Sequence, residues 1–235
     1  FGYPGGAVLH IYDALFAAKD IKHVLVRHEQ GATHAADGYA RACNKPGVVL
    51  VTSGPGITNC VTGIATAHMD SIPMIVISGQ VSRQYVGSDA FQEADATGIT
   101  RPICKHNFLI NDRESIADTF RKAFIIATTG RPGPVIIDIP KDLTDPNVKI
   151  DFEYKKNIKI RSYKIKTNED DNKIEEAAKI LCSAKKPMIY SGGGVILSKA
   201  SKELIKLTKL LNYPITNTLM GCLLYTSPSP RDLAV

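Results

Sequence analysis

Three short runs of β-branched residues constrain this fold more than any other feature of the sequence. They read PGVVLVTS (46–53), PMIVIS (73–78) and PGPVIIDIP (132–140), and a weaker run, HVLV (23–26), precedes them. Successive apolar positions require burial of both faces of a strand, which is typical of parallel strands covered by helices. We therefore predict a doubly wound α/β domain with a parallel sheet.

The segments between and after these runs predict the domain organisation. Residues 30–43 and 112–129 carry helical signals, and residues 1–145 form the first domain. A polar, lysine-rich stretch at 146–170 is predicted to be a linker. Residues 171–221 then read as helix (172–183), strand (187–191), glycine loop (192–194) and helix (198–211), the start of a second Rossmann-like α/β domain.

The last fourteen residues, CLLYTSPSPRDLAV (222–235), have no amphipathic period and contain two Ser-Pro pairs. They resemble the translation of an adapter used in preparing DNA libraries. We predict that this tail is not native and exclude it from the fold.

Composition excludes several classes of function. The chain of 235 residues has a net charge of +6, but its lysine-rich part lacks interleaved aromatic residues, which argues against a nucleic-acid partner. No apolar run approaches the roughly 18 residues that span a bilayer, so no membrane association is expected. The five cysteines show no CxxC spacing, which favours a reducing compartment, the cytoplasm.

The stretch HEQGATH (28–34) places a carboxylate, Glu29, between an apolar run and a small-residue helix. A zinc-protease motif would need a second histidine four residues after His28, where this chain has Ala32. Glu29 could simply be a helix-start carboxylate favoured by the helix dipole. From the residues alone this alternative stays open.

Two glycine turns follow predicted strands, and each is a weak signal by itself. VTSGPGITN (51–59) and SGGG (191–194) lie where open α/β sheets bind ligands, and their glycines let the backbone approach a ligand closely. Asp89, Glu93 and Asp95 could be a divalent-ion cluster, but a solvated face is favoured because no rigid loop pattern surrounds them. No metal ligands are predicted in this chain.

Seven motifs in order resemble the catalytic subunits of the acetolactate (acetohydroxyacid) synthase family over residues 1–221. They are FGYPGGAVLHIYDAL, RHEQGATHAADGYARA, TSGPGITN, MDSIPMIVISGQV, GSDAFQEADATGITRPICKHNF, TTGRPGPVIIDIPKD and NTLMG. The resemblance implies a thiamin-diphosphate pyrimidine-binding domain, lacking its first segment, and the start of a central FAD-binding domain. It also implies a third domain that holds magnesium and the diphosphate through a GDG…N motif, which this chain does not contain.

The family decarboxylates pyruvate and transfers the two-carbon unit to pyruvate or 2-ketobutyrate, the first common step of branched-chain amino-acid biosynthesis. The implied cofactors are thiamin diphosphate, Mg²⁺ and FAD. The implied partners are further copies, in a homodimer or homotetramer, and a small regulatory subunit. The location would be the cytoplasm, or a plastid in a eukaryote. We expect no turnover from these 235 residues alone.

The resemblance also assigns roles to individual residues. Glu29 would hydrogen-bond the cofactor's aminopyrimidine, Gln92 and Phe91 would adjoin the reacting carbonyl, and Lys141 would attract keto-acid anions at the channel mouth. Gly56 and Ser71 would be further thiamin-diphosphate neighbours. The residues matching FAD contacts are Arg131, Gly193, Thr218 and Leu219.

Two alternatives remain beside this resemblance. One is a sister enzyme, such as glyoxylate carboligase or pyruvate oxidase, against which Glu29 and the DAFQE motif argue. The other is a non-catalytic nucleotide-binding fragment. One departure from many family members is Ser82, where they have proline; because the position is associated with sulfonylurea herbicides, we expect weaker inhibition by them.

Overall fold

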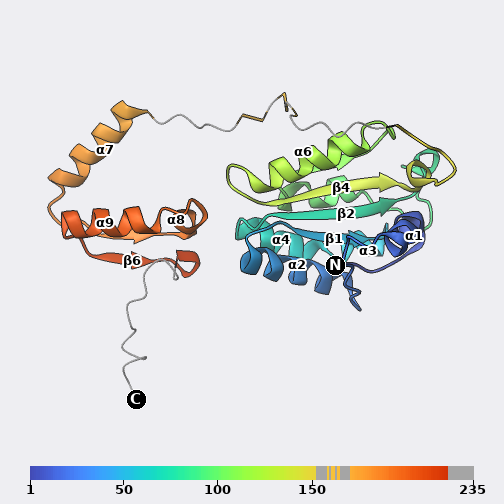
Figure 1. Ribbon diagram of the computed structural model, residues 1–235, viewed down its shortest axis with the longest axis horizontal. Coiled ribbons are helices and arrows are strands. Elements are labelled where there is room, and N and C mark those ends of the chain that lie inside the picture. The colour runs from blue at the N-terminus through green and yellow to red at the C-terminus, as the bar shows by residue number, and fades with distance from the viewer. Residues whose placement is uncertain (152–157, 159, 162, 165–169, 222–235) are drawn as a thin grey trace, which may run out of the picture. The chain divides into compact units, whose positions relative to one another are not determined.

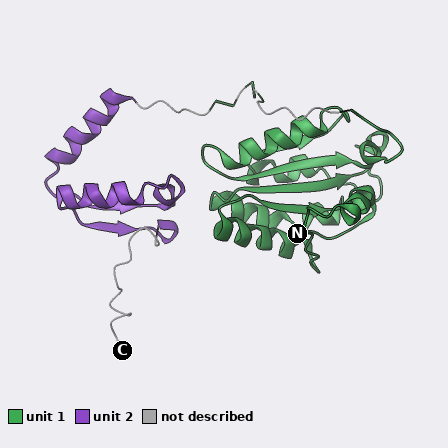
Figure 2. Cartoon of the chain, viewed as in Figure 1, with its two compact units in different colours: residues 1–165 green, residues 166–235 purple. Residues whose placement is uncertain are grey.

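The computed structural model describes residues 1–151, 158, 160–161, 163–164 and 170–221. The chain divides into two compact units, residues 1–165 and 166–235 (Figure 2). The tail predicted to be non-native, residues 222–235, lies outside the described residues, as does much of the predicted linker.

Unit 1 contains a parallel four-stranded sheet with the order β1-β2-β4-β3. Its strands are β1 (Gly47–Val51), β2 (Met74–Gln80), β3 (His106–Leu109) and β4 (Pro134–Pro140). The three β-branched runs are β1, β2 and β4, as predicted, and every residue of β4 is buried.

The sheet also corrects two expectations. The run 23–26 is not a strand: among the described residues it joins the sheet through one bridge, between Leu25 and Gly2. The edge strand β3 was not predicted, because its sequence, HNFL, is only partly buried and contains two polar residues.

Helices cover both faces of this sheet, which confirms the doubly wound α/β fold (Figure 1). The α-helices of unit 1 are α1 (Leu9–Ala17), α2 (Glu29–Cys43), α3 (Pro55–Thr58), α4 (Val61–Met69), α5 (Ala96–Thr100) and α6 (Ile116–Thr128). The short 3-10 helices are η1 (Gly6–Val8), η2 (Arg83–Tyr85), η3 (Arg101–Ile103) and η4 (Lys141–Thr144). One apolar core forms between the sheet, α2 and α4, and a second forms beneath α6.

Unit 2 is a smaller α/β unit built on two parallel strands. Its elements are α7 (Asp171–Ser183), β5 (Ile189–Ser191), α8 (Gly193–Leu197), α9 (Ser201–Leu211), β6 (Ile215–Asn217) and η5 (Leu219–Gly221). The predicted helices and strand of this segment are present. Two elements were not predicted: β6, and α8, which begins inside the predicted glycine loop. None of the helices in residues 1–151 and 170–221 is long and apolar enough to cross a membrane.

Part of the predicted linker packs on unit 1. Ile160 and Tyr163 contact the core beneath α6. Lys105 Nζ donates a hydrogen bond to the Tyr163 hydroxyl at 2.9 Å and another to the carbonyl of Thr129 at 2.6 Å. The Tyr163 hydroxyl in turn donates to the Thr129 carbonyl at 2.8 Å. These bonds anchor residue 163 at the end of α6.

Candidate functional site

The candidate site lies at the carboxyl edge of the sheet in unit 1, the edge at which open α/β sheets bind ligands. Glu29 is the first residue of α2, where the helix dipole favours a negative charge. Glu29 is only 8% exposed to solvent. Asn59, which follows α3, donates a hydrogen bond from Nδ2 to Glu29 Oε2 at 3.0 Å. The carboxylate is therefore both buried and oriented.

A buried thiol adjoins this carboxylate. Cys60 Sγ lies 3.9 Å from the Glu29 carbonyl oxygen and 3.3 Å from that of Gly56. Burial raises the pKa of the Cys60 thiol, and the Glu29 charge raises it further. Because the thiolate is the nucleophilic form, Cys60 is not suited to be a nucleophile here.

The glycine turn after β1 brings Gln92 to the same edge. Gly54 has a φ of +58°, and a Cβ on it would lie 2.6 Å from the carbonyl oxygen of Gln92. Gly56 follows within α3 and is buried against Thr52. Both glycines are thus needed for close packing, and the backbone of Gln92 rests directly on the turn.

The segment that carries Phe91 and Gln92 presents both to solvent in this chain. Phe91 is 88% exposed, and Gln92 is exposed with a left-handed φ of +59°. Residues held in this region of backbone space cost free energy and persist only where their surroundings impose it. The segment is therefore built to hold a strained conformation.

Glu93 supplies part of that constraint. Its carboxylate accepts hydrogen bonds from the backbone amides of Gly87 and Ala90. These backbone hydrogen bonds lower the pKa of Glu93, so it is charged at neutral pH. Glu93 thus binds backbone amides, and no three His, Cys, Asp or Glu side chains come together as metal ligands in the described residues.

Lys141 begins η4 directly after β4, so it also lies at the carboxyl edge, where it is partly buried. Beside it, Arg83 Nε donates to Asp142 Oδ2 at 2.7 Å and joins η2 to η4. Burial would raise the pKa of Asp142, but hydrogen bonds from Arg83 outweigh it and lower the pKa. Ser82 occupies the N-cap position of η2 next to this pair, without a side-chain capping hydrogen bond.

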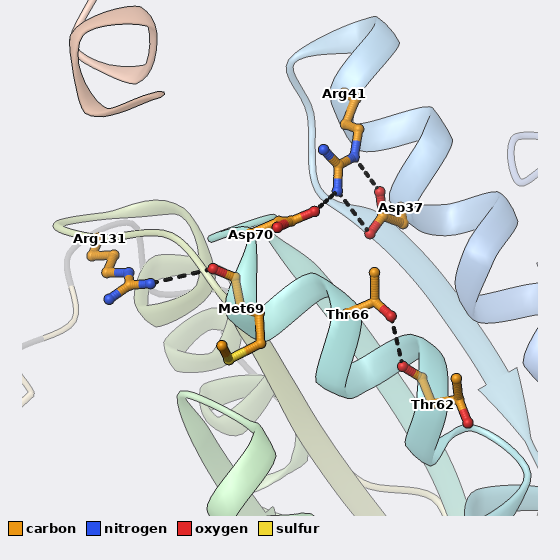
Figure 3. A network of polar contacts seen from close by, with 7 residues as sticks. All are labelled: Asp37, Arg41, Thr62, Thr66, Met69, Asp70 and Arg131. Carbon is orange, nitrogen blue, oxygen red and sulfur yellow. Dashed lines mark hydrogen bonds and ion pairs between the residues drawn. The ribbon is translucent and has the colours of Figure 1, made fainter. Parts of the chain in front are cut away.

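Ser71 and Arg131 lie elsewhere. They precede β2 and β4, at the amino edge of the sheet, and Arg131 Nε donates to Ser71 Oγ at 2.7 Å. Arg131 Nη2 also lies 3.4 Å from the carbonyl oxygen of Met69, next to the ion pairs of Arg41 (Figure 3). Ser71 thus lies at the opposite edge of the sheet from Glu29, and its predicted contact with thiamin diphosphate stays a prediction.

In unit 2 the sequence-predicted residues do come together. Gly193 starts α8 after β5, and Thr218 and Leu219 follow β6, so all three lie at the carboxyl ends of paired parallel strands. The Thr218 amide donates to the Ser191 carbonyl at 2.8 Å. Leu219 is 87% exposed.

Two buried polar atoms mark the same edge of unit 2. Ser191 Oγ and Asn217 Oδ1 are buried on register-paired strands and have no hydrogen-bond partner among the described residues. Buried polar groups are nearly always hydrogen-bonded, so this edge offers unsatisfied groups to a ligand.

The sequence reasoning missed three residues of the carboxyl edge: Asn59, Gln80 and Asp138. Asn59 was within the quoted turn motif, but its contact with Glu29 spans 30 residues. Asp138 did leave a signal, since it is the one charged residue in the run PVIIDIP. Burial raises its pKa to about 7.

Comparison with known proteins agrees with this architecture. Residues 1–99 match the family model of the thiamine pyrophosphate enzyme N-terminal TPP binding domain, and residues 174–234 match that of the thiamine pyrophosphate enzyme central domain. A solved structure described as a thiamin diphosphate-dependent enzyme of Mycobacterium smegmatis superposes with a TM-score of 0.79 at 25% identity, covering 94% of this chain and 41% of that chain. The chain belongs to the thiamine pyrophosphate enzymes.

Within that class its relatives are acetolactate synthase large subunits. The chain is 59% identical to the one from Buchnera aphidicola subsp. Schizaphis graminum over 221 residues, which is 94% of this chain and 39% of the relative. It is 53% identical to the Haemophilus influenzae large subunit over 235 residues, all of this chain and 41% of the relative. Acetolactate synthase isozyme 3 large subunit of Escherichia coli is 52% identical, with 94% and 38% covered.

The matches cover nearly all of this chain but only part of each relative. The chain spans about two fifths of the length of the curated relatives it matches. The central-domain match and the H. influenzae alignment reach into residues 222–235, whereas the Buchnera alignment covers 221 residues. The non-native origin of the tail stays a prediction.

Proposed function

We propose that this chain provides the pyrimidine-binding side of an acetolactate synthase active site, which decarboxylates pyruvate and transfers the two-carbon unit to pyruvate or 2-ketobutyrate. The observation that carries the proposal is Glu29, a buried carboxylate oriented by Asn59 at the carboxyl edge of the sheet, with the backbone of Gln92 packed on the adjacent Gly54 turn. The similarity to acetolactate synthase large subunits supports the same activity.

The residues present fit thiamin diphosphate. Asn59 donates to Oε2 of Glu29 and orients this carboxyl group, which would hydrogen-bond the aminopyrimidine of the bound cofactor. When bound, the cofactor supplies the electron sink that decarboxylation requires. The role of Glu29 would be to hold a proton at, or accept one from, the pyrimidine ring, which is general acid–base catalysis.

Phe91 and Gln92 contribute to the reacting centre from the other side of the turn. The exposed ring of Phe91 can cover the bound substrate and exclude water, and the Gln92 amide can donate to or accept from the reacting carbonyl. Lys141, at the same edge, draws keto-acid anions toward the site because its charge is positive.

We further propose FAD as a ligand of unit 2, with Gly193, Thr218 and Leu219 as contacts. The unsatisfied Ser191 Oγ and Asn217 Oδ1 support this, because a bound nucleotide's hydroxyl or amino groups can satisfy them. The Arg131 contact with FAD stays a prediction. We also propose Mg²⁺ as counter-ion of the cofactor diphosphate, with ligands from outside the described residues. Among the described residues, no group of three His, Cys, Asp or Glu side chains could hold a metal ion.

The partners in this proposal are further copies of the chain, as a homodimer or homotetramer, and a small regulatory subunit. The relatives named "large subunit" support the second partner. The cytoplasmic location stays a prediction.

Product analysis tests the activity. The full-length protein, meaning residues 1–221 within a chain of the length of the curated relatives, is incubated with thiamin diphosphate, Mg²⁺, FAD, pyruvate and 2-ketobutyrate. We expect acetolactate and acetohydroxybutyrate. Parallel incubations replace the keto acids with glyoxylate, or supply pyruvate with inorganic phosphate and oxygen. Formation of tartronate semialdehyde in the first, or of acetyl phosphate in the second, with no acetohydroxy acid in the main assay would instead support a sister enzyme. Cofactor binding without any product would support a non-catalytic module.

A further inference from the structure

Asp138 is a buried carboxyl group to which the reaction outlined above gives no role. It lies in β4, flanked in register by Ser78 of β2 and Leu109 of β3, and its residue is 2% exposed. Its Oδ1 has no hydrogen-bond partner among the described residues. An ionised carboxylate in this setting costs free energy, because burial removes its hydration and only one of its oxygens is hydrogen-bonded. Such a costly group calls for a functional explanation.

The other carboxylate oxygen of Asp138 binds Gln80, and the whole amide group of Gln80 is engaged. Gln80 Nε2 donates to Asp138 Oδ2 at 3.0 Å and to the carbonyl of Ala94 at 2.9 Å. Gln80 Oε1 accepts from the Val81 amide at 2.9 Å. The two acceptors fix Nε2 on one side and the Val81 donor fixes Oε1 on the other, so the amide has one orientation.

This chain of hydrogen bonds ends in the segment that carries Gln92. Ala94 follows Gln92 by two residues and immediately precedes the cap of α5. The segment contains three left-handed residues, Gly87, Asp89 and Gln92, with φ of +86°, +54° and +59°. Such a backbone needs fixed attachment points, and the bond from Gln80 to Ala94 provides one on the buried side.

We propose that Asp138 is a positioning residue which, through Gln80 and Ala94, holds the segment 81–95 so that Phe91 and Gln92 face the reacting centre. The role in turnover rests on the proposed function, whereas the structural coupling can be tested without it. Asp138 itself touches neither substrate nor cofactor in this scheme. Its carboxylate acts by keeping the Gln80 amide aligned.

The surroundings of Asp138 make the coupling sensitive to pH. Burial raises the pKa of Asp138 to about 7, the hydrogen bond from Gln80 and the nearby Ser78 hydroxyl oppose this rise, and the charge of Asp95 adds to it. The elements next to Asp138 present few other titratable groups: β3 contributes the neutral Leu109, and η4 begins three residues later with Lys141 and Asp142. Since ionised acceptors make stronger hydrogen bonds, the ionised form holds Gln80 more firmly.

Two variants separate positioning from general stability. Asp138→Asn keeps an acceptor for Gln80 at nearly the same volume but does not titrate, and Asp138→Leu removes the acceptor with an apolar, larger side chain. Ile137→Val is the matched control, because Ile137 is buried in the same strand but belongs to the core beneath α6, on the other face. All three are compared with the parent.

The first readout is cleavage of the 235-residue chain by chymotrypsin after Phe91, followed by mass spectrometry. We expect several-fold faster cleavage in Asp138→Leu, and rates near the parent in Asp138→Asn and Ile137→Val. Equal rates in Asp138→Leu, Ile137→Val and the parent would overturn the proposal, whatever the enzymatic activity. A variant that unfolds would be cleaved everywhere, so the ratio of cleavage after Phe91 to cleavage elsewhere is the quantity compared.

The second readout is turnover of pyruvate by the full-length protein. We expect kcat to fall by about tenfold or more in Asp138→Leu, because small displacements of reacting groups are costly. Asp138→Asn should stay within about threefold and lose the rise of kcat through pH 7. A parent that makes no acetolactate would refute the proposed function and leave the cleavage test standing. An active parent whose Asp138→Leu variant keeps its kcat would refute the positioning role.

Discussion

Replacing Asp138 with asparagine should change how stability depends on pH. The carboxyl pKa rises from 3.8 to about 7 in the folded chain, chiefly through burial. Each unit of difference between the folded and unfolded pKa corresponds to about 1.4 kcal/mol in the free energy of unfolding. The roughly three units here therefore amount to about 4 kcal/mol. Asp138 is almost fully buried, so solvent screening removes little of this.

The sign of the effect follows from proton binding. Between pH 4 and pH 7 the folded chain binds the Asp138 proton while the unfolded chain has released it. The contribution of Asp138 to the free energy of unfolding therefore falls as pH rises through this window, and it stays low above pH 7. Asparagine does not titrate, so the variant lacks this loss.

Urea titrations followed by circular dichroism at pH 4.5, 6, 7 and 8 measure the difference. The free energy of unfolding of Asp138→Asn minus that of the parent should increase by about 3–4 kcal/mol from the lowest to the highest pH. His23 and His106 also have lowered pKa values through burial, but they are common to both proteins and cancel in the difference. Ile137→Val should differ from the parent by about 1 kcal/mol at every pH. If the difference in free energy of unfolding between Asp138→Asn and the parent is also independent of pH, the reasoning is refuted.

Three further substitutions test other parts of the structure. Gly54→Ala should destabilise unit 1 by roughly 1–3 kcal/mol and lower kcat, because the turn has φ +58° and a Cβ would meet the Gln92 backbone; an unchanged urea midpoint would count against this. Tyr163→Phe should lower the thermal midpoint by about 2–4 °C, because it removes the hydroxyl bound to Lys105, and an unchanged midpoint would show that this anchor is weak. Ser82→Pro should make the full-length enzyme more sensitive to sulfonylureas, and equal dose curves for parent and variant would refute that expectation.

Much of the fold was predictable because its strands are buried on both faces. Uninterrupted apolar runs identified β1, β2 and β4 from the sequence. The edge strand β3 and the short β6 are only partly buried, so they leave no comparable pattern. The apolar run around Leu25 shows the opposite error. It was predicted to be a strand, but it pairs with the first residues of the chain only through an isolated bridge.

The site was predictable only as far as local motifs reach. Glu29 and Gln92 belong to recognisable motifs, and the structure places both at the carboxyl edge. The contacts that orient them join distant positions: Asn59 reaches Glu29 over 30 residues, and Asp138 reaches Gln80 over 58. The separation of Ser71 from this edge likewise depends on where β2 begins and ends, which motif matching ignores.

The most direct test of the account is the substitution Glu29→Gln in the full-length protein. Glutamine retains an oxygen that can accept from Asn59, so the local structure should persist, while the ability to hold a proton at the pyrimidine ring is lost. Glu114→Gln, at an exposed position, is the matched control. We predict that acetolactate formation from pyruvate falls by about a hundredfold or more in Glu29→Gln, with an unchanged circular dichroism spectrum, and stays at the parental rate in Glu114→Gln. Turnover by Glu29→Gln within about threefold of the parent would contradict the central claim.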